Sequence, residues 1–136
     1  MANLSNYFEN AIINQMRNNA GPQTDTYVAL FTADTGLETD DPSAELTIGS
    51  GSYSRQSAGL IAPINGESDN ASDINFPIAT ANWGTITHIA LVDHQTNEDW
   101  GNDVHVLMWS PLDNSKTINT DDMFKINTGD LDVTIT

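Results

Sequence analysis

The sequence predicts a mainly β protein, an antiparallel β-sandwich or jelly-roll-like domain that carries one amphipathic α-helix at its N-terminus. Helical spacing of apolar residues occurs near the start of the 136-residue chain and nowhere later. Seven or eight short strand-like runs follow, roughly 8–12 residues apart, which is typical of sandwiches and barrels. The last run alternates between apolar and polar residues, as an antiparallel strand with one buried face does.

We expect one domain over residues 1–136, with the helix in residues 1–20 and the β-sandwich in residues 26–136. A single domain is the default for a chain of this length, which hides roughly two thirds of its unfolded surface on folding. Apolar residues make up 38% of the chain, below the roughly 45–50% of typical globular domains. A modest core beneath a large polar surface is therefore expected.

The N-terminal helix is predicted from the segment NLSNYFENAIINQMRNN, residues 3–19. Ser5 is the expected N-cap, and Gly21 with Pro22 is the expected stop. Apolar side chains at spacings of three and four form one stripe, which is made of Leu4, Phe8, Ala11, Ile12 and Met16. Such a stripe suits a helix that covers one end of a sheet, and equally a helix that packs against copies of itself or anchors the protein in a larger particle. The candidate assembly contacts are Leu4, Phe8, Ile12 and Met16.

Strands are predicted where β-branched and aromatic residues gather between turn-forming segments. The expected strands are 26–33, 53–64, 74–79, 84–93 and 104–112, followed by two strands within 124–136 that flank a turn at Gly129. The segments expected to form loops or contain turns are 34–52, 65–73, 94–103 and 113–123. The first of these is acidic and contains Gly, Pro and Ser, which indicates a long surface loop.

The segment NFPIATANWGTITHIALVDHQTN, residues 75–97, raises a choice between a strand with catalytic histidines and the spine of a packed domain. We interpret it as the spine, because it is dense in β-branched and aromatic residues. The residues expected in the core are Phe76, Trp83, Ile86, Ile89 and Leu91. Strand alternation predicts two faces. One consists of Ile86, His88, Ala90 and Val92, and the other of Thr87, Ile89 and Leu91.

The chain is strongly acidic, with 19 Asp plus Glu, four Lys plus Arg and a formal net charge of −15. A nucleic-acid backbone requires several basic contacts, so nucleic acid is not an expected partner. No apolar run approaches the roughly 18 residues of a membrane span, and a secretory signal is not expected either. The absence of cysteine excludes disulfides, zinc-thiolate sites and a cysteine nucleophile.

No catalytic, cofactor-binding or metal-ligating residue is assigned. His88, His94 and His105 do not follow the spacing of zinc or iron motifs, and histidines that hydrogen-bond or lie at an interface are expected. The acidic loops are similar to calcium loops in composition but lack their ligand spacing. No pair of acids stands out as a glycosidase dyad. Neither an enzyme nor a bound cofactor is therefore expected.

Trp100 is the tryptophan expected to be exposed, because it lies in an acidic polar loop. An exposed tryptophan beside Asn and Asp suits a sugar or a protein partner, so Trp100 is the candidate contact to a host glycan or to another protein. Trp83 and Trp109 are expected to be buried. Arg55, one of only four basic residues, is expected to pair with a carboxylate within or between subunits.

Five segments, taken in order, carry a resemblance to a known protein family. They are LSNYFENAII, YVALFTA, YSRQ (53–56), FPIATANWGTITHIALVD and TGDLDVTIT. In this order they resemble a family of small structural proteins of tailed bacteriophages that is often labelled tail-fibre-like. The resemblance covers nearly the whole chain and is most specific in the fourth segment, while the loop EDWGND departs from it by replacing a shorter turn. It implies a structural role in the virion and assigns no catalytic residue.

We therefore expect a non-enzymatic virion structural protein, assembled in the host cytoplasm and displayed on the particle surface, whose copies associate as a homotrimer. Its other expected partners are virion proteins such as the major capsid protein or tail and collar proteins. Capsid decoration is slightly favoured, because one domain without a stalk, repeats or heptads differs from a long fibre. The alternative is a tail, collar or head fibre or adaptor protein that binds a host glycan.

Overall fold

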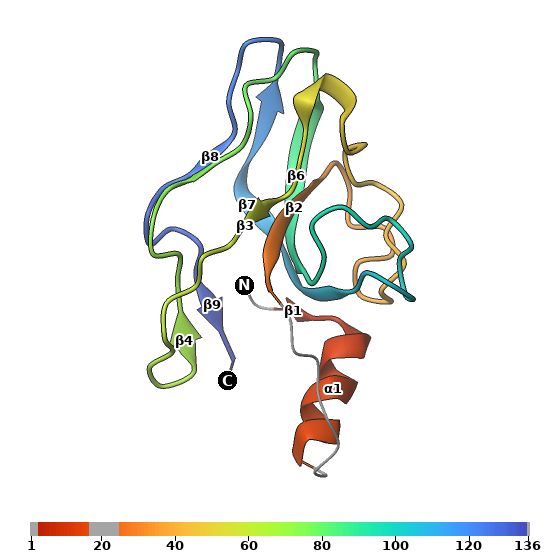
Figure 1. Cartoon of the computed structure of the whole chain (residues 1–136), viewed down its shortest axis with the longest axis vertical. Helices are drawn as coiled ribbons and strands as arrows, with labels where there is room; N and C mark the ends of the chain where they lie inside the picture. The colour runs from red at the N-terminus through yellow and green to blue at the C-terminus, as the bar shows by residue number, and fades with distance from the viewer. Residues whose placement is uncertain (1–2, 17–24, 136) are drawn as a thin grey trace.

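The computed structural model describes residues 3–16 and 25–135 of the chain. Its centre is a five-stranded antiparallel sheet in the order β1-β7-β6-β2-β3 (Figure 1). The strands of this sheet are β1 (Asn3–Leu4), β2 (Tyr27–Phe31), β3 (Gln56–Ser57), β6 (Gly84–Val92) and β7 (Val106–Ile118). The helix α1 (Asn6–Met16) follows β1 and extends from one end of the molecule.

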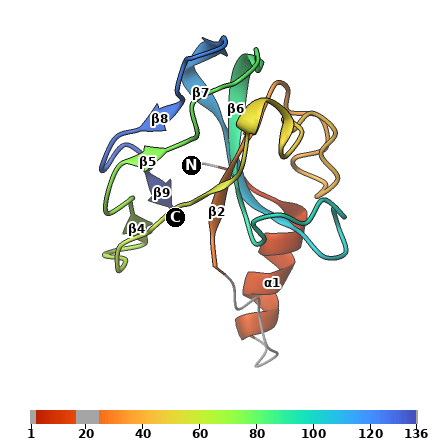
Figure 2. The same ribbon diagram turned by 45° about the horizontal axis from the view of Figure 1, so that its top comes forward.

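Two short antiparallel ladders form a second layer. They pair β4 (Glu67–Ser68) with β9 (Val133–Thr134), and β5 (Ile74–Asn75) with β8 (Lys125–Ile126). Figure 1 and Figure 2 place both ladders on one side of the central sheet and the long loops that follow β2 and β6 on the other. A single turn of 3-10 helix, η1 (Ser50–Ser52), precedes β3. The predicted class, mainly antiparallel β in sandwich-like layers with one α-helix, is confirmed for the described residues.

The central sheet is covered on both faces, which explains why β2 reads as the continuous apolar run VALF. The larger core cluster lies between the sheet and the ladders. It includes Val28, Leu30, Phe124 and Val133, together with all five residues predicted for the core. The smaller cluster, under the loops, includes Ala29, Phe31, Leu37, Val92 and Val104. Successive residues of β2 therefore alternate between the two clusters.

The face predicted for Ile86 is wrong. This residue lies in the larger cluster with Leu91, whereas Ala90 and Val92 belong to the smaller cluster. The register between β6 and β7 shifts between Ile86 and His88. An irregularity of this kind lets neighbouring side chains change face, so strict alternation fails at this point and holds for the residues after it.

The strand predicted over residues 53–64 is much shorter in the structure. Only Gln56–Ser57 of this segment pairs with β2, as strand β3. Gly59 has a φ of +56°, which lies in the left-handed region and interrupts a regular strand. Before β3, the side chains of Tyr53 and Arg55 are buried. The segment therefore contributes to the interior of the protein more than to the sheet.

The segment 65–73, predicted as a turn or loop, contains strand β4. Asn65 and Gly66 have φ values of +53° and +79°, and they form the turn of a hairpin in which Ile64 pairs with Glu67. An Asn-Gly pair is the strongest short-range signal for a hairpin, because both positions require a positive φ. The sequence therefore contained the information for this hairpin.

Strand β7 continues to Ile118, beyond its predicted end at residue 112. Thr117 pairs with Thr85 of β6, and the hydroxyl oxygens of the two residues lie 2.9 Å apart in a hydrogen bond. Threonine pairs of this kind stabilise neighbouring antiparallel strands. The turn expected within residues 113–123 consequently falls after Ile118.

The helix α1 is capped as predicted. The Ser5 Oγ atom accepts the Phe8 backbone N–H at 3.2 Å, and it donates to the Val106 carbonyl oxygen. Leu4, predicted as the first residue of the helical stripe, lies in β1 and pairs with β7. This strand fixes the start of the helix to the central sheet. The predicted stop at residues 21–22 lies outside the described residues. No helix in the described part of the chain has the length and apolar character needed to cross a membrane.

Candidate functional site

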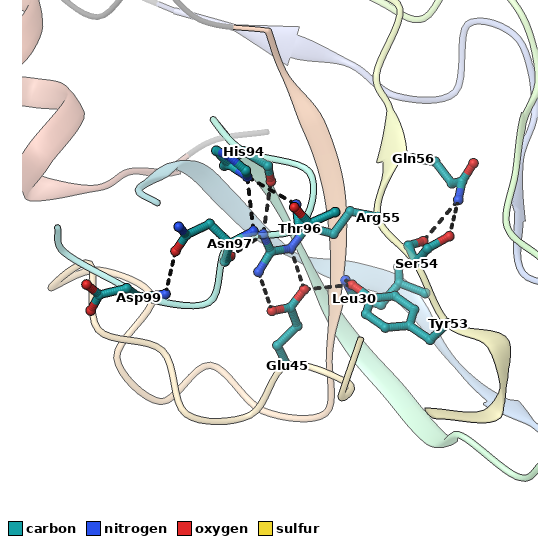
Figure 3. A network of polar contacts seen from close by, with 10 residues as sticks. All are labelled: Leu30, Glu45, Tyr53, Ser54, Arg55, Gln56, His94, Thr96, Asn97 and Asp99. Carbon is teal, nitrogen blue, oxygen red and sulfur yellow. Dashed lines mark hydrogen bonds and ion pairs between the residues drawn. The ribbon is translucent and has the colours of Figure 1, made fainter. Parts of the chain in front are cut away.

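A fully buried arginine joins three segments of the chain beside the central sheet (Figure 3). Arg55 is 0% exposed, and its Nε and Nη2 atoms each donate to one carboxylate oxygen of Glu45 at 2.7 Å. This two-point geometry is among the strongest forms of contact between arginine and a carboxylate. The prediction that Arg55 pairs with a carboxylate is confirmed, and the partner belongs to the same chain.

The same guanidinium group holds the loop 94–103 in place. The Nη1 atom of Arg55 donates to the carbonyl oxygens of His94 and Asn97, at 2.9 and 2.7 Å. The loop is also tightened from within (Figure 3), because the His94 Nδ1 atom accepts the backbone N–H groups of Thr96 at 3.1 Å and of Asn97 at 3.0 Å. His94 is thus a hydrogen-bonded residue of the loop, as predicted.

Tyr53 connects this network with the larger core cluster. Its hydroxyl group donates to the Glu45 Oε1 atom at 2.8 Å and accepts the Leu30 backbone N–H at 3.1 Å. Burial, followed by the negative charge of Glu45, raises the pKa of Tyr53 well above its usual value of 10.0. Ionisation of this phenol is therefore unfavourable in the folded protein.

Trp100 packs on the buried arginine. The Arg55 Cζ atom lies 4.9 Å from the centroid of the indole ring, which is a cation–π arrangement. The Phe31 ring centroid lies 6.3 Å from that of Trp100. The side chain is therefore half-buried, although an exposed position is predicted for it. Trp100 helps to fix the loop 94–103, and its contact to a glycan or protein partner stays a prediction.

The indole N–H groups of the other two tryptophans donate to different kinds of acceptor, a backbone carbonyl and a carboxylate. Trp83 is buried in the larger cluster, as predicted, and its Nε1 atom donates to the Gly51 carbonyl oxygen at 2.9 Å. Trp109, for which burial is predicted, is only half-buried. Its Nε1 atom donates to the Glu38 Oε2 atom at 3.0 Å. A tryptophan at the edge of the core can keep its apolar body inside and its N–H near the surface.

A second polar cluster attaches α1 to the start of β7. One carboxylate oxygen of Asp40 lies 2.6 Å from the His105 Nδ1 atom, and the other accepts the Val106 N–H at 2.6 Å. The ring of Tyr7 stacks on the His105 ring, with centroids 3.7 Å apart and planes 2° from parallel. Burial and the charges of Asp93 and Asp40 raise the pKa of Tyr7. Sequence reasoning missed this cluster, because its members lie far apart along the chain and follow no motif.

The remaining histidine also has local partners. The His88 Nδ1 atom lies 2.8 Å from the Thr87 Oγ1 atom, and its ring centroid lies 6.2 Å from that of Trp109. Within residues 3–16 and 25–135, no group of three or more His, Asp or Glu side chains is arranged to hold a metal ion. Each of the three histidines in the sequence has a hydrogen-bonding partner within the described residues.

The predicted assembly contacts divide into two groups in the structure. Leu4 and Phe8 pack, half-buried, against the larger core cluster of their own chain. Ile12 is also half-buried, whereas the Met16 side chain is 82% exposed. Among the residues predicted from the stripe, Met16 is therefore the one most open to another molecule.

The exposed end of α1 carries two exposed apolar side chains and almost no charge. Ile13 is 54% exposed and precedes Met16 by one helical turn. Glu9 is the charged residue of the helix segment NYFENAIINQM, and it lies in the first turn. Sequence reasoning missed Ile13, because spacing alone did not indicate which side of the helix packs on the sheet.

Comparison with known proteins assigns the chain to a family. No curated protein matches it. A protein-family model described as Podophage GP4 fiber I protein gp80 matches residues 3–134, nearly the whole chain. The predicted resemblance to tail-fibre-like phage proteins is thereby confirmed. This chain therefore belongs to that podophage fibre family, whose members are structural components of the virion.

Proposed function

We propose that this chain is a non-enzymatic structural subunit of a phage fibre, displayed on the particle surface, and that its copies associate as a homotrimer through α1. The observation that carries the proposal is the pair of exposed apolar side chains at the charge-poor end of this helix. Ile13 and Met16 are 54% and 82% exposed, in a chain whose net charge is −15. The family match supports the fibre role.

Electrostatic repulsion limits where copies of this chain can meet. Like charges brought together across an interface cost several kcal/mol, and acidic residues outnumber basic ones by 19 to four. The exposed end of α1 avoids this cost. Burial of a large exposed aliphatic side chain contributes about 1.5–3 kcal/mol. Three copies that bury Ile13 and Met16 together would therefore gain a small apolar centre, and linked copies would hold the particle more tightly than one copy does.

The family description supports a fibre as the place of the subunit on the particle. Capsid decoration is the competing assignment. The sequence slightly favours it, because it predicts one compact domain without a stalk. The proposal gives Trp100 a role in packing the loop 94–103 rather than in binding a host glycan, because its ring already lies on Arg55. Mass spectrometry of purified virions with peptide standards tests the location. A few copies per particle support a fibre, and parity with the major capsid protein would indicate decoration.

The variant I13D/M16D is expected to be a monomer, whereas the native protein is expected to be a trimer. Aspartate places a charge at each exposed apolar position of α1 and adds to the existing repulsion between copies. Light scattering at several protein concentrations measures the mass. The native protein should have three times the chain mass of 14.8 kDa, and the variant should have the mass of one chain.

The matched control introduces the same two charges away from α1. Ile78 and Met123 are 59% and 45% exposed, and they lie in the connections before β6 and after β7. The variant I78D/M123D should remain a trimer. A native protein that is monomeric at every concentration, or a control that dissociates as fully as I13D/M16D, would refute self-association through α1.

A further inference from the structure

The two-stranded β4–β9 ladder is extended by isolated bridges to residues 60–64, beside the central sheet. Isolated bridges join residues 60–64 to the segment 67–70, and β4 in turn pairs with β9. Figure 2 places β4 and β9 next to each other, on the side of the sheet that carries the ladders. Leu131 and Val133 bury the inner face of this ladder in the larger core cluster.

A groove of about 540 Å³ lies on the outer face of this ladder. Its apolar part is formed by Ile61 and Ile64, which are 43% and 71% exposed. The side chains of Glu67, Asp69 and Asp132 line the same groove. Lys and Arg are absent from the described residues that line it. The groove thus combines exposed aliphatic carbon with three carboxylates.

Two of these carboxylates lie directly beside the ends of neighbouring strands. Ser68 pairs with Val133, so the next residues along the two antiparallel strands, Asp69 and Asp132, lie across from each other on the outer face. Like charges directly opposite each other destabilise a sheet. In the described part of the chain, no ion pair involves Asp69 or Glu67. A positively charged partner would therefore give Glu67 and Asp69 the ion pairs that the described residues do not supply.

We propose that this groove binds a basic segment of another virion protein. The carboxylates would accept hydrogen bonds from lysine or arginine, and Ile61 with Ile64 would cover the aliphatic stems of those side chains. A second copy of this chain does not suit the groove, because it would bring 19 acidic residues and only four basic ones. The inference rests on the proposed function of a virion subunit and adds the chemistry of its neighbour.

Zero-length cross-linking of purified virions identifies the occupant. A carbodiimide joins a carboxylate to a lysine amine that is in direct contact with it. We expect Glu67, Asp69 or Asp132 to be joined to lysines of a different virion protein, and peptide mass spectrometry locates the joined residues. Cross-links from these carboxylates to Lys116 or Lys125 of another copy would overturn the proposal.

A charge-neutral variant tests the groove without depending on lysine. The variant E67Q/D69N/D132N keeps the size of the side chains and removes their charge. It should fold at least as stably as the native protein, because opposed carboxylates are gone. Its number of copies per virion should nevertheless fall about tenfold or more, since the charged contacts with the partner are lost.

The matched control, D34N/D41N/D113N, removes three exposed carboxylates elsewhere on the chain. It should enter virions in the native number of copies. A native number of copies for the groove variant would overturn the docking site and leave the proposed function intact. The proposed function itself fails on different measurements, namely the mass of the native protein in solution and its copy number relative to the major capsid protein.

Discussion

Arg55→Met is expected to lower the free energy of unfolding by about 3–5 kcal/mol. The substitution leaves the Glu45 carboxylate, whose side chain is 7% exposed, without its charged partner. It also removes the donor that holds the carbonyl oxygens of His94 and Asn97. A buried carboxylate without a partner must be desolvated or take up a proton, so the loss exceeds that of an ordinary hydrogen bond. Urea denaturation followed by tryptophan fluorescence measures the change.

Lys125→Met is the matched control, because it also removes a positive charge from an ion pair. The Lys125 Nζ atom lies 3.2 Å from the Asp73 Oδ2 atom, but the two side chains are 42% and 43% exposed. Exposed pairs of this kind contribute about 0–1 kcal/mol. Equal losses in the two variants would contradict the importance of burial. Adding Glu45→Leu to Arg55→Met should recover part of the loss, since the unpaired carboxylate is then absent.

Raising the pH above 10 is expected to lower the stability of the native protein by up to about 1.4 kcal/mol per pH unit. Burial raises the pKa of Tyr53 well above 10.0, so the folded protein keeps a phenol proton that the unfolded chain releases. The stabilisation is complete below pH 10 and is lost as the pH rises toward the pKa of the folded state. Urea denaturation at pH steps from about 8 to 11.5 gives the slope.

Tyr53→Phe isolates this contribution. The variant should be less stable at neutral pH by about 1–3 kcal/mol, because the Leu30 N–H and the Glu45 carboxylate each lose a partner. As the pH rises above 10, the stability of the variant should fall less steeply than that of the native protein. The two curves of stability against pH should therefore approach each other. Parallel curves would assign the alkaline loss to other groups, such as Tyr7, whose pKa is also raised.

The parts of the fold that depend on neighbouring residues could be predicted from the sequence. Ser5 accepts the Phe8 N–H only three positions away, and such a cap depends on local geometry. The strand of residues 84–93 was predictable because this stretch is rich in β-branched residues, and Gly84–Val92 do form a strand of nine residues. The Asn65–Gly66 pair was an equally local signal for a hairpin, but the segment was predicted only as a turn or loop.

The contacts between distant segments could not be predicted in the same way. Arg55 is ten residues from Glu45 and 39 from His94 along the chain. Nothing local indicates which of 19 acids will be its partner, since the choice is made when two loops pack on the same face of the sheet. The change of face at Ile86 has a similar origin, because it depends on the register with β7.

The candidate contact surfaces were predictable only in part. The stripe on α1 indicated an apolar helix, but whether a given residue faces the sheet or solvent depends on how β1 attaches the helix to β7. Met16 was therefore found and Ile13 was missed. The acidic groove draws its side chains from the hairpin of residues 60–70 and from the distant segment that contains β9, so it became visible only once β4 and β9 were paired.

The edges of the central sheet bear on aggregation during virion assembly. The outer strands β1 and β3 have two residues each, too short to offer a long template for another sheet. Strand β7 continues beyond its pairing with β1 and forms the edge of the sheet there. This part of β7 contains Pro111 and Lys116, and its register with β6 is irregular. Proline, charge and irregularity all oppose edge-to-edge pairing. Newly made subunits can therefore accumulate before assembly with little tendency to join strand to strand into amyloid-like stacks.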